Sequence, residues 1–235
     1  MKNTRITIIF ISLLIYSIPC FAAGQRDIFG VWGSVKLQGD FKPLSPELRK
    51  FKWAVMNQTR TRDDSSRGSR FFQDLLFGQV GYQLGNNASL WLGYAHTWTS
   101  PLNKLSFQES RPYQDFVWGQ KIKTLKLMTR SRMEQRIRET TGDVGYRARQ
   151  LFKISHPLPF VNNLSIYVGD EILFYMNENK FGKKGFSENR VFSGLSYQAT
   201  EKMNIGLGYM GQYVDTISGK NIFTHNIEVN LGIKI

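Results

Sequence analysis

Hydrophobic and polar side chains alternate along most of this chain with the period of a β-strand. Successive side chains of a strand point to opposite faces, so an alternating segment has one apolar and one polar face. The final residues show the pattern most clearly, because Ile227, Val229, Leu231, Ile233 and Ile235 share one parity and mostly polar residues occupy the other. The alternation predicts an all-β protein.

Eleven such segments are expected, and helical periodicity is confined to one turn at Pro46 to Lys50. An odd count conflicts with the even strand numbers of single-chain bacterial barrels, so either the first segment is an inward or partial strand or one strand is missed or split. We therefore predict a transmembrane antiparallel β-barrel of about 10 to 12 strands. The segments lie near residues 28–38, 51–61, 70–84, 88–98, 114–123, 125–137, 144–155, 164–175, 188–199, 202–214 and 223–235.

The connections between these segments alternate in length. Outer-membrane barrels have short periplasmic turns and longer external loops, so the short set and the C-terminus are expected on the periplasmic side. The short connections are Gly85 to Asn87, Lys123 to Lys126, His156 to Asn163 and Thr200 to Lys202. The long ones are Arg62 to Ser69, Ser100 to Tyr113, Asn177 to Ser187 and Asp215 to Asn221.

The hairpin from Lys126 to Lys153 carries charge on one face only. Arg130, Arg132, Glu134 and Arg136 share one parity of the first strand, and Arg147, Arg149 and Lys153 share one parity of the second. The opposite parity holds Leu125, Leu127, Met133, Ile137, Val144, Tyr146, Phe152 and Ile154. In a membrane barrel the apolar face meets lipid and the charged face lines the lumen.

The N-terminus has the features of a secretory signal peptide. Lys2 and Arg5 precede the apolar run Ile6 to Ile18, and Cys20 and Ala22 form a small-x-small pattern. This predicts cleavage after Ala22, a barrel domain over residues 23–235, and localisation to the outer membrane of a Gram-negative bacterium. A lipidated Cys20 is the less favoured alternative, because Pro19 is not the small residue that lipidation requires. After cleavage no cysteine remains for disulfides or metal ligation.

The chain is strongly basic, with a formal net charge of +13, or +11 (13 − 2) without Lys2 and Arg5. Nucleic acid is the habitual partner of such a chain, but an exported protein meets lipopolysaccharide phosphates first, so nucleic acid is not expected. Basic residues at Lys180, Lys183 and Lys184 could bind such phosphates, although charges on an exposed loop are ordinarily just solvated. The expected partners are outer-membrane lipid, lipopolysaccharide and the barrel-assembly machinery, which reads an amphipathic last strand.

Several stretches together resemble one family, the outer-membrane β-barrels catalogued as domain of unknown function 2490. They are FGVW at Phe29 to Trp32, QTR at Gln58 to Arg60, RSRMEQR at Arg130 to Arg136, GYRAR at Gly145 to Arg149, DEILFYMN at Asp170 to Asn177, ENR at Glu188 to Arg190, IGLGYMGQY at Ile205 to Tyr213 and HNIEVNLGI at the C-terminus. The resemblance covers the whole mature chain. It implies a barrel in the outer membrane and no known activity.

Strand parity predicts a set of charged residues in the lumen. Either arginine and glutamate side chains pair into a network that fills a small barrel, or they line a narrow water-filled pore that favours anions. The set comprises Arg60, Arg130, Arg132, Glu134, Arg136, Arg147, Arg149, Glu171, Arg190 and Glu228. A soluble sandwich or lipocalin-like barrel would instead place these arginines in water.

Catalytic and cofactor signals are weak. A rim histidine, His96 or His225, could serve as the base of an enzyme acting on lipid A or external substrates, but no serine stands out as its nucleophile. The GLGYMG sequence at Gly206 to Gly211 lies inside an alternating strand and lacks the strand–turn–helix context of a dinucleotide site. No metal-ligand spacing appears. The sequence thus favours a barrel without enzymatic activity or a cofactor.

Overall fold

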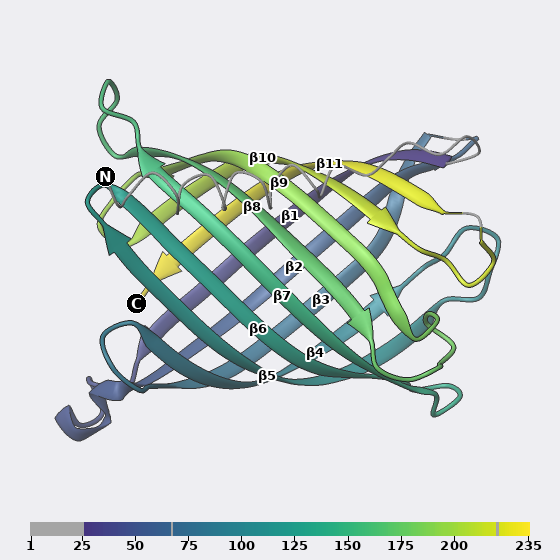
Figure 1. The fold of residues 1–235 in the computed structure, drawn as a ribbon, viewed down its shortest axis with the longest axis horizontal. Helices are drawn as coiled ribbons and strands as arrows, with labels where there is room; N and C mark the ends of the chain where they lie inside the picture. The colour runs from purple at the N-terminus through teal and green to yellow at the C-terminus, as the bar shows by residue number, and fades with distance from the viewer. Residues whose placement is uncertain (1–25, 67, 220) are drawn as a thin grey trace, which may run out of the picture.

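Eleven β-strands form a single closed barrel (Figure 1), which confirms the predicted fold class and lies within the predicted range of strand number. The computed structural model describes residues 26–66, 68–219 and 221–235. The expected signal peptide and Cys20 lie outside the described residues. The strands are β1 (Arg26–Asp40), β2 (Phe51–Ser65), β3 (Gly68–Gln83), β4 (Ala88–Thr99), β5 (Phe107–Ile122), β6 (Leu125–Arg138), β7 (Val144–Pro157), β8 (Leu164–Tyr175), β9 (Gly185–Gln198), β10 (Met203–Val214) and β11 (Ile222–Lys234), and a 3-10 helix, η1, spans Pro46–Lys50.

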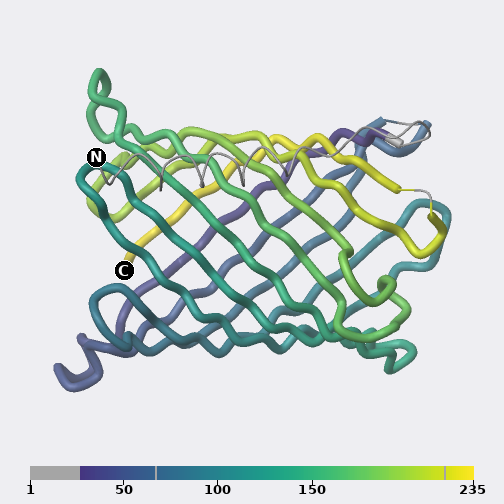
Figure 2. Tube along the Cα trace, in the orientation of Figure 1, coloured from purple at the N-terminus to yellow at the C-terminus, as the bar shows by residue number. Residues whose placement is uncertain are grey.

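The barrel closes where β1 meets β11, and this pair is parallel whereas every other neighbouring pair is antiparallel. The pairing runs without interruption from Arg26 opposite Ile222 to Gln38 opposite Lys234. Figure 2 shows the purple β1 and the yellow β11 running side by side along the wall. When strands alternate in direction around an odd-numbered barrel, the first and last must run the same way. The expectation of an even count is therefore wrong, and the first segment is a full strand of the wall.

The two ends of the barrel differ, and we name them by their connections. The turn end carries residues 84–87, 123–124 and 199–202, together with η1, the 158–163 turn and Ile235. The loop end carries the connections from β4 to β5, from β6 to β7 and from β8 to β9, and β1 begins there. Two predicted long loops are shorter than expected, because β2 continues to Ser65 and β5 already begins at Phe107.

The wall is apolar outside and polar inside. Exposed aliphatic and aromatic side chains cover the outer face; Leu92 and Phe29 are 67% and 61% exposed. The buried side chains of the interior include Glu109, Glu134 and Arg147, whose exposed fractions are 0%, 4% and 4%. Within the described residues no helix has the length and apolar character needed to cross a bilayer. The polarity is thus the reverse of that in a water-soluble domain, where apolar side chains are the ones most often buried.

Candidate functional site

A network of arginines and carboxylates fills the interior between the middle of the barrel and the loop end. We call it the arginine network. Strand alternation places its members inside, because residues of one parity on β5 to β9 all point toward the axis. The members are Glu109, Arg111, Asp115, Arg130, Arg132, Glu134, Arg136, Arg147, Arg149, Glu171, Glu188 and Arg190.

Glu171 on β8 accepts hydrogen bonds from three arginines that come from three other strands. Its Oε1 lies 2.7 Å from Nη2 of Arg130 and 2.8 Å from Nη2 of Arg149. Its Oε2 lies 3.1 Å from Nη1 of Arg190. The side chain is almost completely buried, so its charge depends on these partners rather than on water.

Two further glutamates extend the network around the barrel. Glu134 on β6 pairs with Arg147, whose Nε lies 2.7 Å from Oε1, and with Arg149, whose Nη1 lies 3.1 Å from Oε2. Glu188 on β9 pairs with Arg190 and lies 3.7 Å from Nη1 of Arg147. Because Arg147, Arg149 and Arg190 each contact two glutamates, β6 to β9 are linked through one continuous set of ion pairs.

The β5 side of the network has two separate groups of ion pairs. Glu109 is fully buried and accepts from Arg111 at 2.8 Å and from Arg136 at 2.7 Å. Asp115 holds Arg132 by two parallel bonds of 2.6 and 2.7 Å, and that guanidinium lies 3.7 Å above the ring of Tyr113. Fork-shaped pairing of this kind is a property of arginine that lysine cannot reproduce.

All ten predicted lumen residues face the interior. Eight of them are members of the arginine network. Arg60 bonds Gln58 and Gln73 and stacks 3.6 Å from the ring of Trp32 instead of meeting a carboxylate. Glu228 on β11 faces the same interior but has no hydrogen bond or ion pair to another described residue. The structure therefore gathers the predicted set in one place but leaves Glu228 apart.

Sequence reasoning missed four members of the network: Glu109, Arg111, Asp115 and Glu188. The first two were assigned to the long connection from Ser100 to Tyr113. In the structure Pro112 points outward within β5, and Glu109, Arg111, Tyr113 and Asp115 alternate inward. This shared strand parity is the sequence signal that could have identified them as interior residues.

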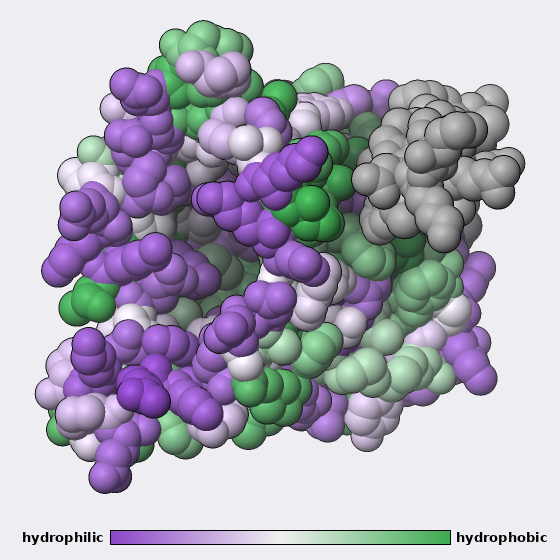
Figure 3. Space-filling view, turned by 60° about the vertical axis from the view of Figure 1, so that its left-hand side comes forward, coloured by the Kyte–Doolittle hydropathy of each residue, from purple (hydrophilic) through white to green (hydrophobic). Residues whose placement is uncertain are grey.

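The interior toward the turn end is hollow. A cavity of about 500 Å³ opens between the arginine network and this end. Among the described residues its lining has nine Lys or Arg side chains and four carboxylates. Glu109 and Glu188, which lie outside this lining, pair with three of the arginines, so three positive charges remain in excess (9 − 4 − 2). Figure 3 shows hydrophilic side chains gathered around a hollow on the end of the molecule that is turned toward the viewer.

Arginine and lysine are segregated along the barrel axis. Arginines supply the cations of the buried network, whereas the inward-facing lysines, Lys36, Lys52, Lys121, Lys126, Lys153 and Lys234, all lie in the half nearer the turn end. Arginine pairs well when desolvated, while the compact ammonium of lysine is more strongly hydrated. The segregation indicates a dry half and a wet half.

We expect Arg132→Lys to lower the free energy of unfolding by about 1.5 to 3 kcal/mol, because an ammonium cannot keep both bonds to Asp115. The matched control is the reciprocal change Lys126→Arg at the exposed turn end, for which no loss is expected. Chemical denaturation in detergent micelles, followed by tryptophan fluorescence, measures both. Equal midpoints for Arg132→Lys and the wild type would contradict a dry network.

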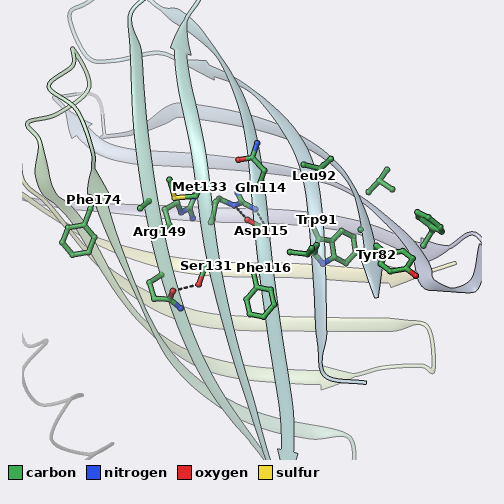
Figure 4. Close-up of a pocket in the computed structure, with 17 residues that line it drawn as sticks. Tyr82, Trp91, Leu92, Gln114, Asp115, Phe116, Ser131, Met133, Arg149 and Phe174 are labelled. Atoms are coloured by element: carbon green, nitrogen blue, oxygen red, sulfur yellow. Dashed lines mark hydrogen bonds and ion pairs between the residues drawn. The ribbon is translucent and has the colours of Figure 1, made fainter. Parts of the chain in front are cut away.

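A second concavity, of about 770 Å³, lies on the outer wall across β2 to β8. Figure 4 shows Phe116, Met133 and Phe174 beside it, and a hydrogen bond of 2.6 Å joins Ser131 to Gln150. Most of its surface is apolar. Its lining consists mostly of outward side chains, but Asp115, Arg132 and Arg149 of the arginine network also border it.

Each candidate histidine lies near a carboxylate, and Ser110, directly opposite His96, donates to the same Glu139. Both rings face outward: His96 lies 3.4 Å from Glu139 and 2.9 Å from Gln108, and His225 lies 2.7 Å from the Tyr209 hydroxyl. In the described part of the chain, no serine or threonine hydroxyl bonds to either ring. No group of three metal-ligating side chains occurs among the described residues either.

Comparison with known proteins places the chain in a family. The model described as "Protein of unknown function (DUF2490)" matches residues 29–223. The chain belongs to this family. An uncharacterized protein of Methylorubrum extorquens is 27% identical over 169 residues, which cover 71% of this chain and 74% of the relative. No solved structure matches. The DUF2490 match includes every member of the arginine network.

Proposed function

We propose that this DUF2490 protein is a non-enzymatic outer-membrane β-barrel whose arginine network acts as an internal brace and closes the lumen toward the loop end. The observation that carries the proposal is the inverted polarity of the wall. Apolar side chains cover the outside, whereas the buried interior is built from paired charges. A soluble monomer rarely exposes apolar patches above a few hundred Å² (roughly 300 to 600), whereas lipid would cover such a wall.

Aromatic side chains at both ends support the same proposal. Tyr94, Trp98 and Tyr146 are exposed toward the loop end, and Phe51 and Tyr82 toward the turn end. Aromatic rings concentrate at the two membrane–water interfaces of barrels. In this orientation the turn end faces the periplasm, and the loop lysines Lys180, Lys183 and Lys184 face the phosphates of lipopolysaccharide.

Three measurements test the proposal. The folded protein should migrate faster than the boiled protein in a detergent gel, and cell fractionation should recover it with the outer membrane. Export through the signal peptide should remove residues up to Ala22, which mass spectrometry of the purified protein measures. Recovery as a soluble periplasmic monomer would contradict the proposal.

A narrow anion pore is the second candidate, and the basic cavity at the turn end favours it. A through-pore would require water to pass the arginine network, where Glu109 and Leu173 are 0% exposed. For this reason we expect the wild type to give no steady conductance in a planar bilayer. A stable current whose reversal potential in a salt gradient has the sign of anion selectivity would establish the pore instead.

A further inference from the structure

The wet half of the interior holds more positive charge than its carboxylates can neutralise. Lys52 pairs with Asp40 at 3.1 Å. Among the described residues, the other inward-facing lysines, Lys36, Lys121, Lys126, Lys153 and Lys234, form no ion pair with a carboxylate. Glu228 is the remaining carboxylate of this region, and its charge acts on Lys153 without an ion-pair contact. Folding has therefore gathered like charges that would repel one another in an empty cavity.

The arrangement of these cations is specific. Lys121 and Lys126 stand directly opposite each other on β5 and β6, a like-charge pairing that destabilises a sheet. Deeper inside, Arg130 and Lys36, which come from β6 and β1, line the same cavity. The entrance at the turn end and the deeper part of the cavity thus both carry positive charge.

Arg130 has an unused donor at the boundary between the two halves. Its Nη2 is bound to Glu171 at 2.7 Å, but its buried Nε has no hydrogen-bond partner in the described structure. Lys153, on the neighbouring strand, places its Nζ 4.0 Å from the centre of the Tyr167 ring. A buried donor without a partner is costly, and an anion that accepts from it would remove that cost.

We propose that this cavity is a binding site for a phosphate group, held by Lys36, Arg130 and Lys153 and reached from the turn end past Lys121 and Lys126. A phosphate carries up to two charges and several acceptor oxygens, which suits point donors from lysines together with one guanidinium. A carboxylate, with one charge and two oxygens, would leave more of these donors unused. The cavity of about 500 Å³ accommodates a phosphate together with a small organic substituent.

The proposal deepens the proposed function and rests on it only for the side of entry, the periplasm. Binding itself is a property of the folded barrel in micelles, so it can fail while the outer-membrane location holds, and the reverse is also true. Two sources supply this chemistry: free phosphates and phospholipid headgroups. The experiment separates them.

Isothermal titration calorimetry on the full mature protein, in zwitterionic micelles at low salt, tests the site with three phosphate probes and with acetate as a control anion. The phosphate probes are inorganic phosphate, glycerol 3-phosphate and dihexanoyl phosphatidic acid below its micellar concentration. We expect saturable binding of phosphate probes that weakens with added salt, and at least tenfold weaker binding in Lys36→Met/Lys153→Met. Methionine keeps the apolar stem and removes the charge. Tighter binding of the lipid than of glycerol 3-phosphate identifies a headgroup as the ligand; equal or weaker binding of the lipid identifies a soluble phosphate.

The matched control is Lys183→Met/Lys184→Met, which removes the same charge from the exposed loop end and should leave binding unchanged. Heat-modifiable migration checks that each variant is folded. Absence of saturable binding to the wild type, equal affinity for acetate, or equal loss in the control variant would each overturn the proposal. Because the wild-type titration alone can do so, the test does not depend on the variant folding.

Discussion

Glu171→Ala is expected to lower the free energy of unfolding by about 3 to 5 kcal/mol, the usual cost of breaking a buried ion pair by removing one partner. The reason is that only two of its three arginine partners retain another carboxylate. Arg149 keeps Glu134 and Arg190 keeps Glu188, but Arg130 keeps no carboxylate among the described residues. Chemical denaturation in micelles measures the change, and Glu178→Ala in an exposed loop is the matched control.

A second variant separates an unpaired charge from a merely lost contact. If the stranded guanidinium of Arg130 causes the loss, Glu171→Ala/Arg130→Met should recover part of the stability that Glu171→Ala loses. A double variant less stable than Glu171→Ala would show that the contacts, not the stranded charge, dominate. An unchanged midpoint for Glu171→Ala would mean that water already solvates this part of the interior.

In the proposed orientation, a cysteine at Asp27 is expected to react with a membrane-impermeant maleimide on intact cells, whereas one at Glu201 should react only after the outer membrane is permeabilised. The parallel closure of β1 with β11 causes this difference, since β1 starts at the loop end and Glu201 lies in a turn at the other end. The expected mature chain has no cysteine of its own, so each variant carries a single target.

The labelling has three distinguishable outcomes. Surface labelling at Asp27→Cys alone supports the proposed orientation. Surface labelling at Glu201→Cys alone would reverse the orientation but retain the barrel. Labelling of both from the same side would contradict an odd-numbered barrel.

The alternation along the chain was sufficient to predict the barrel and, within a few residues, nearly all of its strands. It could not predict how the barrel closes, because the parallel pairing between β1 and β11 follows from the odd number of strands and not from the sequence of either strand. A rule that strand numbers are even led to the wrong expectation there. Strand ends were also uncertain: Arg62 and Asp63 look like loop residues by composition, yet they continue β2.

Parity predicted which charged residues enter the interior but not which ones pair. Arg132 pairs with Asp115 directly opposite it on β5, whereas Arg136 reaches diagonally to Glu109 on the same strand, and nothing in the spacing distinguishes these partners. The division into a dry and a wet half was also invisible, since it depends on how far each side chain lies along tilted strands. The choice of arginine or lysine at each inward position does indicate which half is dry and which is wet. Using it requires knowing how far along the barrel axis each residue lies.

The seam between β1 and β11 has a consequence for how this barrel assembles. It joins Val31 to Ile227, residues almost the full length of the chain apart, whereas each other pair of strands is connected by a local hairpin. Closing so long a loop is entropically costly, and parallel pairing is slightly weaker per residue than antiparallel pairing. Closure of the seam should therefore be the slow last step of folding. Until it occurs, β1 and β11 are two unpaired strand edges that are open to any factor that catalyses assembly of the barrel.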